Sequence, residues 1–193
     1  MIEDIEFPII SKSEATPLQY SNAIRSTTKS DCYRSTYPNQ KDYINRVRIT
    51  TKNAWKSIEA ALKGDPELYV NVVYGAKSKG NRYITSMYKY VGTGYGRRRK
   101  IKWATKNIDI IKWSRQDNGE SMKYIWYEKD GRDDSGITVN FSVDFLGYPT
   151  LTGNAEIHIW RNDDKAGESI IYYTDENNTY YNTGIVHYNI QVK

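Results

Sequence analysis

The chain has 193 residues with a formal net charge of +5; 38% of them are hydrophobic and 18 are tyrosines. This length fits one domain with a sizeable core, and the aromatic content excludes a disordered chain. Its single cysteine, Cys32, excludes an intramolecular disulfide and favours a reducing compartment. No apolar run is long enough to span a membrane, and the acidic start MIEDIEFPII is unlike a signal peptide. We therefore expect a cytoplasmic or virion location.

Residues 1–42 are predicted to form an N-terminal arm, partly irregular, because they are rich in Ser, Thr, Asn and Pro and lack periodicity. Glu6 to Ile10 is the part of this arm most suited to add a strand, either to the domain or to a neighbouring copy. The rest of the chain, residues 43–193, is predicted to form one β-rich domain.

That domain opens with a strand, YINRVRIT at 43–50, whose alternation slips once. One short helix follows near 52–63. Thr51 is placed to cap it, Trp55 and Ile58 fall on one face, and Gly64 with Pro66 ends it.

Short strands with turn-forming residues between them make up the remainder, and Asn118-Gly119 and Asp130-Gly131 are typical of hairpin turns. The absence of βαβ alternation favours a mainly β fold: a single antiparallel β-sandwich or jelly-roll-like domain. The expected strands are ELYVNVVYG, RYITSMYKYVG, KIKWAT, IDIIKWSRQ, SMKYIWYEKDG, GITVNFSVDF, AEIHIWRND, SIIYYTDE and GIVHYNIQV.

No pattern indicates an enzyme, a metal site or a cofactor. His158 and His187 stand in separate strands among branched apolar residues, where sheet packing explains them better than metal binding. The clustered acids of the turns lack the spacing of a calcium loop, and Cys32 has no histidine near it in sequence. We therefore expect no enzymatic activity, with an enzyme kept as the least favoured alternative.

The distribution of charge is more informative than its sum. Residues 1–106 contain 20 Lys and Arg against 9 Asp and Glu, a net of +11, whereas residues 107–193 contain 8 against 14, a net of −6. Such asymmetry favours an anionic partner for the basic half, or homo-oligomers that join oppositely charged halves. Alternatively, the two halves intermix in the fold and the asymmetry disappears.

Residues 77–106 contain ten Lys and Arg and no acid, and they include GTGYGRRRKIKW at 92–103. Cations along a strand pair neutralise phosphates, and aromatic rings between them stack on unpaired bases. The expected contact residues are Lys79, Arg82, Lys89, Tyr95, Arg97, Arg98, Arg99, Lys100, Lys102 and Trp103. A solvated hairpin tip is the alternative, because clustered cations also protect edge strands from aggregation.

The sequence therefore predicts a non-enzymatic binding or assembly protein, of the kind found among viral structural proteins. Its expected partner is a polyanion bound through this basic aromatic hairpin, with nucleic acid favoured over an anionic glycan or lipid surface. A lectin-like or membrane-surface-binding β module of toxin type is the alternative.

Overall fold

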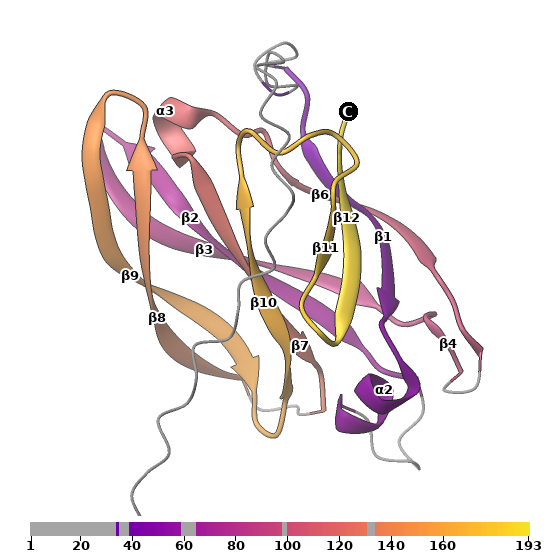
Figure 1. The fold of residues 1–193 in the computed structure, drawn as a ribbon. Helices are drawn as coiled ribbons and strands as arrows, with labels where there is room; N and C mark the ends of the chain where they lie inside the picture. Colours follow the sequence, from indigo (N-terminus) through magenta and orange to yellow (C-terminus); the bar gives the residue numbers. More distant parts are fainter. Residues whose placement is uncertain (1–33, 35–38, 59–64, 98–99, 131–133) are drawn as a thin grey trace, which may run out of the picture.

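The computed structural model describes Arg34 and residues 39–58, 65–97, 100–130 and 134–193; of Arg97, Lys100 and Asp134 it places the backbone alone. Most of the predicted arm, including Cys32, lies outside these residues, as do Arg98, Arg99, Gly131 and the second half of the predicted helix. Figure 1 shows the described elements.

The mainly β prediction is confirmed, since antiparallel sheets make up most of the described chain (Figure 1). Sheet A has the order β11 (Tyr180–Asn182), β12 (Val186–Val192), β1 (Asp42–Ile49), β6 (Ala104–Ile111). Sheet B has the order β10 (Asp164–Tyr172), β7 (Ser121–Glu128), β2 (Leu68–Ser78), β3 (Asn81–Gly92). Two further antiparallel pairs are β8 (Asp134–Phe145) with β9 (Tyr148–Trp160), and β4 (Gly96–Arg97) with β5 (Lys100–Ile101).

Sheet B is the middle of three layers (Figure 1). One of its faces packs against sheet A, and there Tyr124 and Trp126 of β7 lie against Tyr188 of β12. Its other face packs against the β8–β9 hairpin, where Val73 of β2 and Phe141 of β8 share a second core. Buried apolar side chains on both faces explain why β2 is apolar along most of its length.

Asn71 of β2 fastens the β8–β9 hairpin to sheet B. Its fully buried amide Nδ2 donates to the His158 carbonyl at 2.7 Å, and its Oδ1 accepts from the His158 N–H at 3.1 Å. Ser86 of β3 adds a bond from its hydroxyl to the Glu156 carbonyl. Side chains of sheet B thus form hydrogen bonds with backbone groups on the edge of β9 that pairs with no strand among the described residues.

Among the elements that the structure describes in full are two short helices, where the sequence predicted one. The first, α2 (Lys52–Ile58), begins as expected, since the Thr51 hydroxyl accepts from the Ala54 N–H at 3.0 Å. The second, α3 (Arg115–Asn118), replaces the hairpin turn predicted at Asn118-Gly119. Gly119 does adopt a positive φ of 84°, but as the residue that ends a helical turn.

The strand predictions fail at three places. The two strands expected at KIKWAT and IDIIKWSRQ become a two-residue β5 and a continuous β6, which crosses the boundary with Asn107 at a φ of 51°. The short strands β4 and β11 were not predicted, because two or three residues carry no readable alternation. In contrast, the strand predicted at YINRVRIT is present as β1, and the slip in its alternation is a bulge between Ile44 and Arg46.

Candidate functional site

The predicted contact residues do not form one patch. Lys79 and Arg82 lie at one end of the hairpin made by β2 and β3, whereas the β4–β5 hairpin follows the other end of β3. Ten residues of strand separate Arg82 from Gly92, which corresponds to about 33 Å. A single short stretch of ligand therefore does not contact both ends. Apart from the buried Tyr95, the predicted contact residues that the structure describes divide into those of the β2–β3 hairpin and those at the β4–β5 hairpin.

In the first group, Arg82 and Lys89 are engaged within the protein. The Arg82 guanidinium lies 3.4 Å from the centre of the Tyr148 ring and donates to the Gln116 carbonyl at 3.3 Å. Lys89 forms an ion pair with Asp109 of β6 at 3.6 Å, so an acid from outside the acid-free stretch reaches it. Lys79 is exposed in the turn between β2 and β3.

Tyr95 lies in the core between sheets A and B. It is fully buried, its hydroxyl donates to the Gly92 carbonyl at 2.6 Å, and the Lys106 ammonium lies over its ring. Stacking on a ligand needs an exposed ring face, so Tyr95 has no such role in this conformation. The buried ring instead anchors the chain that leads into the β4–β5 hairpin. The backbone of Tyr95 also joins the two sides of that hairpin, because the Lys102 N–H donates to the Tyr95 carbonyl at 2.9 Å.

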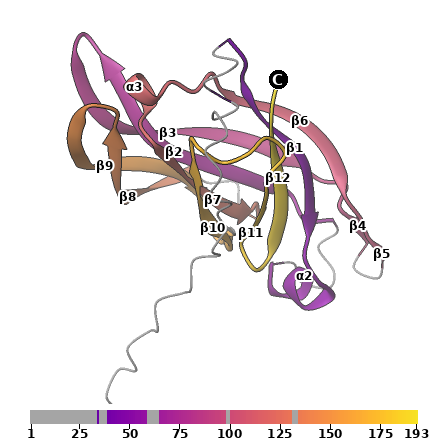
Figure 2. The same ribbon diagram turned by 45° about the horizontal axis from the view of Figure 1, so that its top comes forward.

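The second group lies at the β4–β5 hairpin, which projects beside β1 and β6 (Figure 2). Arg97 pairs with Lys100 across it, so their backbones are opposite each other at its tip; Arg98 and Arg99 between them lie outside the described residues. Lys102 is exposed, and Trp103 follows it directly before β6. These two residues lead from the hairpin onto sheet A.

The face of sheet A that points away from sheet B is called here the outer face. Alternation and register assign side chains to it: Val47, Tyr188 and Ile190 point to the core, so their neighbours in the strands point outward. The outer face is made of Tyr43, Arg46, Arg48, Trp103, Thr105, Asp109, Tyr180, Asn182, His187, Asn189 and Gln191.

Trp103 is the centre of an aromatic and cationic cluster on this outer face. The Arg48 guanidinium lies 4.7 Å from the centre of the Trp103 ring, and the His187 ring lies nearly parallel to it at 6.0 Å. Tyr180 meets the same ring nearly edge-on at 5.4 Å, and its side chain is 53% exposed. Three other segments of the chain, β1, β11 and β12, therefore bring one cation and two rings around Trp103.

His187 is held in its neutral form within this cluster. Its Nδ1 lies 3.1 Å from Nη2 of Arg48, the residue directly opposite on β1. Because a guanidinium only donates, Nδ1 accepts and the proton is on Nε2. Partial burial, and then the positive charge of Arg48, lower the pKa of His187.

We expect the protein to lose stability as His187 is forced to protonate. Its folded pKa is below that of the unfolded chain, so as pH falls through the unfolded value the unfolded state binds the proton first and is favoured. The free energy of unfolding therefore falls on acidification. His187→Gln is expected to remove the contribution of His187 to this pH dependence, because glutamine does not titrate, and its amide oxygen can still accept from Arg48. Urea unfolding at several pH values tests this, and an unchanged pH dependence in the variant contradicts it.

The two outer layers of the sandwich differ in charge. Arg46 and Arg48 lie on the outer face of sheet A, whose one acid, among the residues the structure describes, is Asp109; it pairs with Lys41 and Lys89. In contrast, residues 134–160 of the β8–β9 hairpin contain three acids and no Lys or Arg. Strands of both sequence halves mix in sheets A and B, but the charge asymmetry persists between the two outer layers.

Sequence reasoning missed Arg46, Arg48, Tyr180 and His187 as site residues. Arg46 and Arg48 alternate with Val47 and Ile49 in YINRVRIT, which is the signal of a cationic outward face. Tyr180 had no comparable signal, because β11 was not recognised. His187 was interpreted as sheet packing. It stacks against Trp103, 84 residues away in sequence, because β1 pairs with both β12 and β6.

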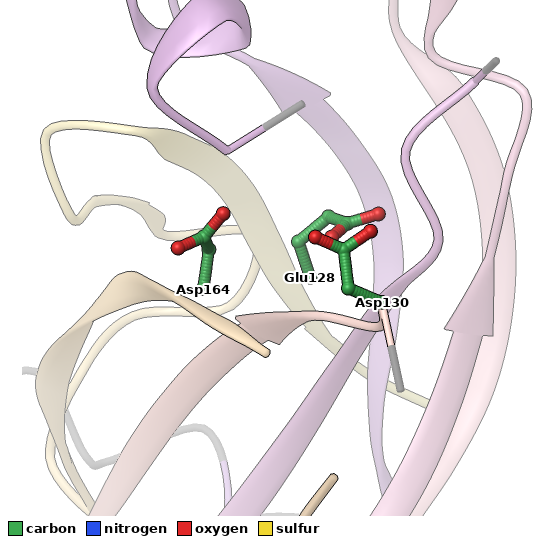
Figure 3. A group of neighbouring side chains, drawn as sticks. All are labelled: Glu128, Asp130 and Asp164. Atoms are coloured by element: carbon green, nitrogen blue, oxygen red, sulfur yellow. The ribbon is translucent and has the colours of Figure 1, made fainter. Parts of the chain in front are cut away.

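An acidic cluster forms where β7 ends and β10 begins (Figure 3). Oxygen atoms of Glu128, Asp130 and Asp164 lie within 4.8 Å of one another. The adjacent Asp163 accepts from the Tyr69 hydroxyl at 2.5 Å and from the Trp160 N–H at 2.7 Å, so it stabilises the turn. Acidic clusters of this kind are common without an ion, and we assign no metal to this one.

Comparisons of the chain with protein-family models, with curated proteins and with solved structures found no match. Within the described part of the chain, neither helix has the length and apolarity to cross a lipid bilayer.

Proposed function

We propose that the protein is a non-enzymatic binding protein that holds polyanions, nucleic acid in particular, on the outer face of sheet A and the adjoining β4–β5 hairpin. The observation that carries this proposal is the cluster around Trp103, in which Arg48, His187 and Tyr180 surround one ring beside the hairpin. The basic stretch of the sequence thereby adjoins a cationic sheet face.

The charges of this surface are suited to phosphate or sulfate groups. Arg46 and Lys102 are exposed, and the acid of the face, Asp109, is paired with lysines next to the Tyr43 end, away from Trp103. Neutralising a polyanion releases its condensed counterions, so binding through such cations weakens steeply with salt. The acidic β8–β9 hairpin on the opposite layer repels the same ligand and so directs it to one side.

The test compares a double variant, Arg46→Ala with Lys102→Ala, to the wild-type protein for binding of a labelled oligothymidylate. Each lost phosphate contact is expected to weaken binding and to reduce the salt slope by about 1, so the pair lowers affinity about tenfold or more at low salt. Fluorescence anisotropy at several salt concentrations measures both quantities.

Lys79→Ala is the matched control, because Lys79 is an exposed cation at the far end of β3. We expect this variant to bind like the wild-type protein. The proposal fails if the wild-type protein does not bind at low salt, if binding is insensitive to salt, or if Lys79→Ala weakens binding as much as the double variant.

A further inference from the structure

The outer face of sheet A carries four aromatic rings outside the core, of which Tyr180 is exposed and the other three are half-buried. Tyr43, Trp103, Tyr180 and His187 all lie on it, from four different segments of the chain. The outer face of the β8–β9 hairpin is the natural comparison, because its described side chains are mostly threonine, serine and asparagine. The outer face of sheet A differs from it in carrying aromatic rings and two arginines, Arg46 and Arg48, among its polar residues.

The geometry leaves the Tyr180 ring exposed beside a fixed neighbour. Tyr180 lies at the sheet edge on β11, is 53% exposed, and meets Trp103 at an interplanar angle of 69°. Trp103 is in turn fixed by Arg48 and His187, which are hydrogen-bonded to each other. The rings are therefore oriented before any ligand arrives, which lowers the entropy lost on binding.

Cations flank the rings on the same face. Asn189 of β12 lies directly opposite Tyr180 of β11 on one side and directly opposite Arg46 of β1 on the other. Arg46 is therefore two strands away from Tyr180. Strand spacing puts these two residues about 10 Å apart. Cation and ring at this separation suit a chain that has an anion and a planar group in every unit.

We propose that the polyanion is single-stranded nucleic acid, with a base stacked on Tyr180, whose ring is exposed beside Trp103, and phosphates held by Arg46 and Lys102. This inference rests on the proposed polyanion-binding function. Unpaired bases expose a π-face to a protein ring, whereas the bases of a duplex stack on one another and present phosphates and groove edges. An exposed ring on a cationic sheet face thus distinguishes single strands from duplexes, heparin and anionic vesicles, which offer negative charge without an accessible base.

The experiment measures binding of four probes to the full chain: a labelled oligothymidylate, a DNA duplex of the same length, heparin, and phosphatidylserine vesicles. We expect the single strand to bind most tightly. Tyr180→Ala is expected to weaken its binding by about fivefold to a hundredfold, with an unchanged salt slope, because a stack and not a phosphate contact is lost. Tyr180→Phe keeps the ring and is expected to restore binding.

Tyr172→Ala is the matched control, since Tyr172 is 40% exposed on β10 of sheet B. We expect it to bind all four probes like the wild-type protein. If Tyr180→Ala binds the single strand as the wild-type protein does, or if the duplex or heparin binds equally well, the stacking inference is wrong while polyanion binding stands. If no probe binds, or if vesicles bind best, the proposed function itself fails.

Discussion

Replacing Arg34 with methionine is expected to lower the free energy of unfolding by about 3–5 kcal/mol. The Arg34 guanidinium is almost completely buried, and its Nε and Nη2 donate to the equally buried Asp42 carboxylate, with the shortest distance 2.7 Å. Its Nη1 donates to the carbonyls of Tyr172, Tyr173 and Asp175. The variant leaves a buried charge and three carbonyls without these bonds. Urea unfolding followed by tryptophan fluorescence measures the loss.

Two further variants separate the ion pair from general sensitivity to mutation. In the double variant Arg34→Met with Asp42→Leu, the unpaired charge is gone, so we expect it to recover part of the stability that Arg34→Met loses. Lys165→Ala breaks the exposed pair with Glu168 and is expected to cost less than about 1 kcal/mol. A cost for Arg34→Met within that same range contradicts the structural role given to Arg34.

This ion pair bears on the site because Asp42 begins β1, the strand that carries Arg46 and Arg48. Arg34 joins the start of that strand to the chain that follows β10. A loss here loosens the pairing of β1 with β12, where Arg48 lies opposite His187. We therefore expect any weakening of oligonucleotide binding by Arg34→Met to follow the fraction of protein that is unfolded.

Much of the fold was predictable because its strands are long enough to show alternation. The β2 segment does not alternate, but its apolar run between turn-forming residues is a strong local signal, and so is the Thr51 cap of α2. The division into three layers was not predictable from the sequence. It depends on which apolar face of sheet B meets which partner, and side chains such as Asn71 decide this through contacts 87 residues apart in sequence.

The candidate site was predictable in its charge but not in its geometry. A stretch without acids does identify cations, yet strand length separates Arg82 from Lys102, and the burial of Tyr95 removes its ring from the surface. Conversely, Arg48 joins Trp103 only because β1 pairs with β6. Such pairings are long-range, so no window of sequence contains them.

Gly119→Ala is expected to destabilise the protein by about 2–6 kcal/mol, for two reasons that add. Gly119 has a φ of 84° and a ψ of −176°, a region essentially confined to glycine, where an L side chain costs about 1–3 kcal/mol. An added Cβ would also overlap Val143 Cγ2 and come within 3.0 Å of the Asp144 carbonyl oxygen, and overpacking costs about 1–3 kcal/mol more. The Gly119 carbonyl also accepts from Trp113 Nε1 at 2.8 Å, so movement of this backbone reaches the core.

Gly80→Ala is the control for the first reason. Gly80 has nearly the same φ, 86°, but a Cβ there would meet no atom within 4 Å. We expect Gly80→Ala to cost only backbone strain, about 1–2 kcal/mol, and a loss in Gly119→Ala above about 3 kcal/mol, the upper bound of its own strain, reports the overlap with β8. Equal losses in the two variants, measured by urea unfolding, would show that β8 yields to the added methyl group. The β8–β9 hairpin would then be held less firmly than the close approach of Val143 and Asp144 to Gly119 indicates.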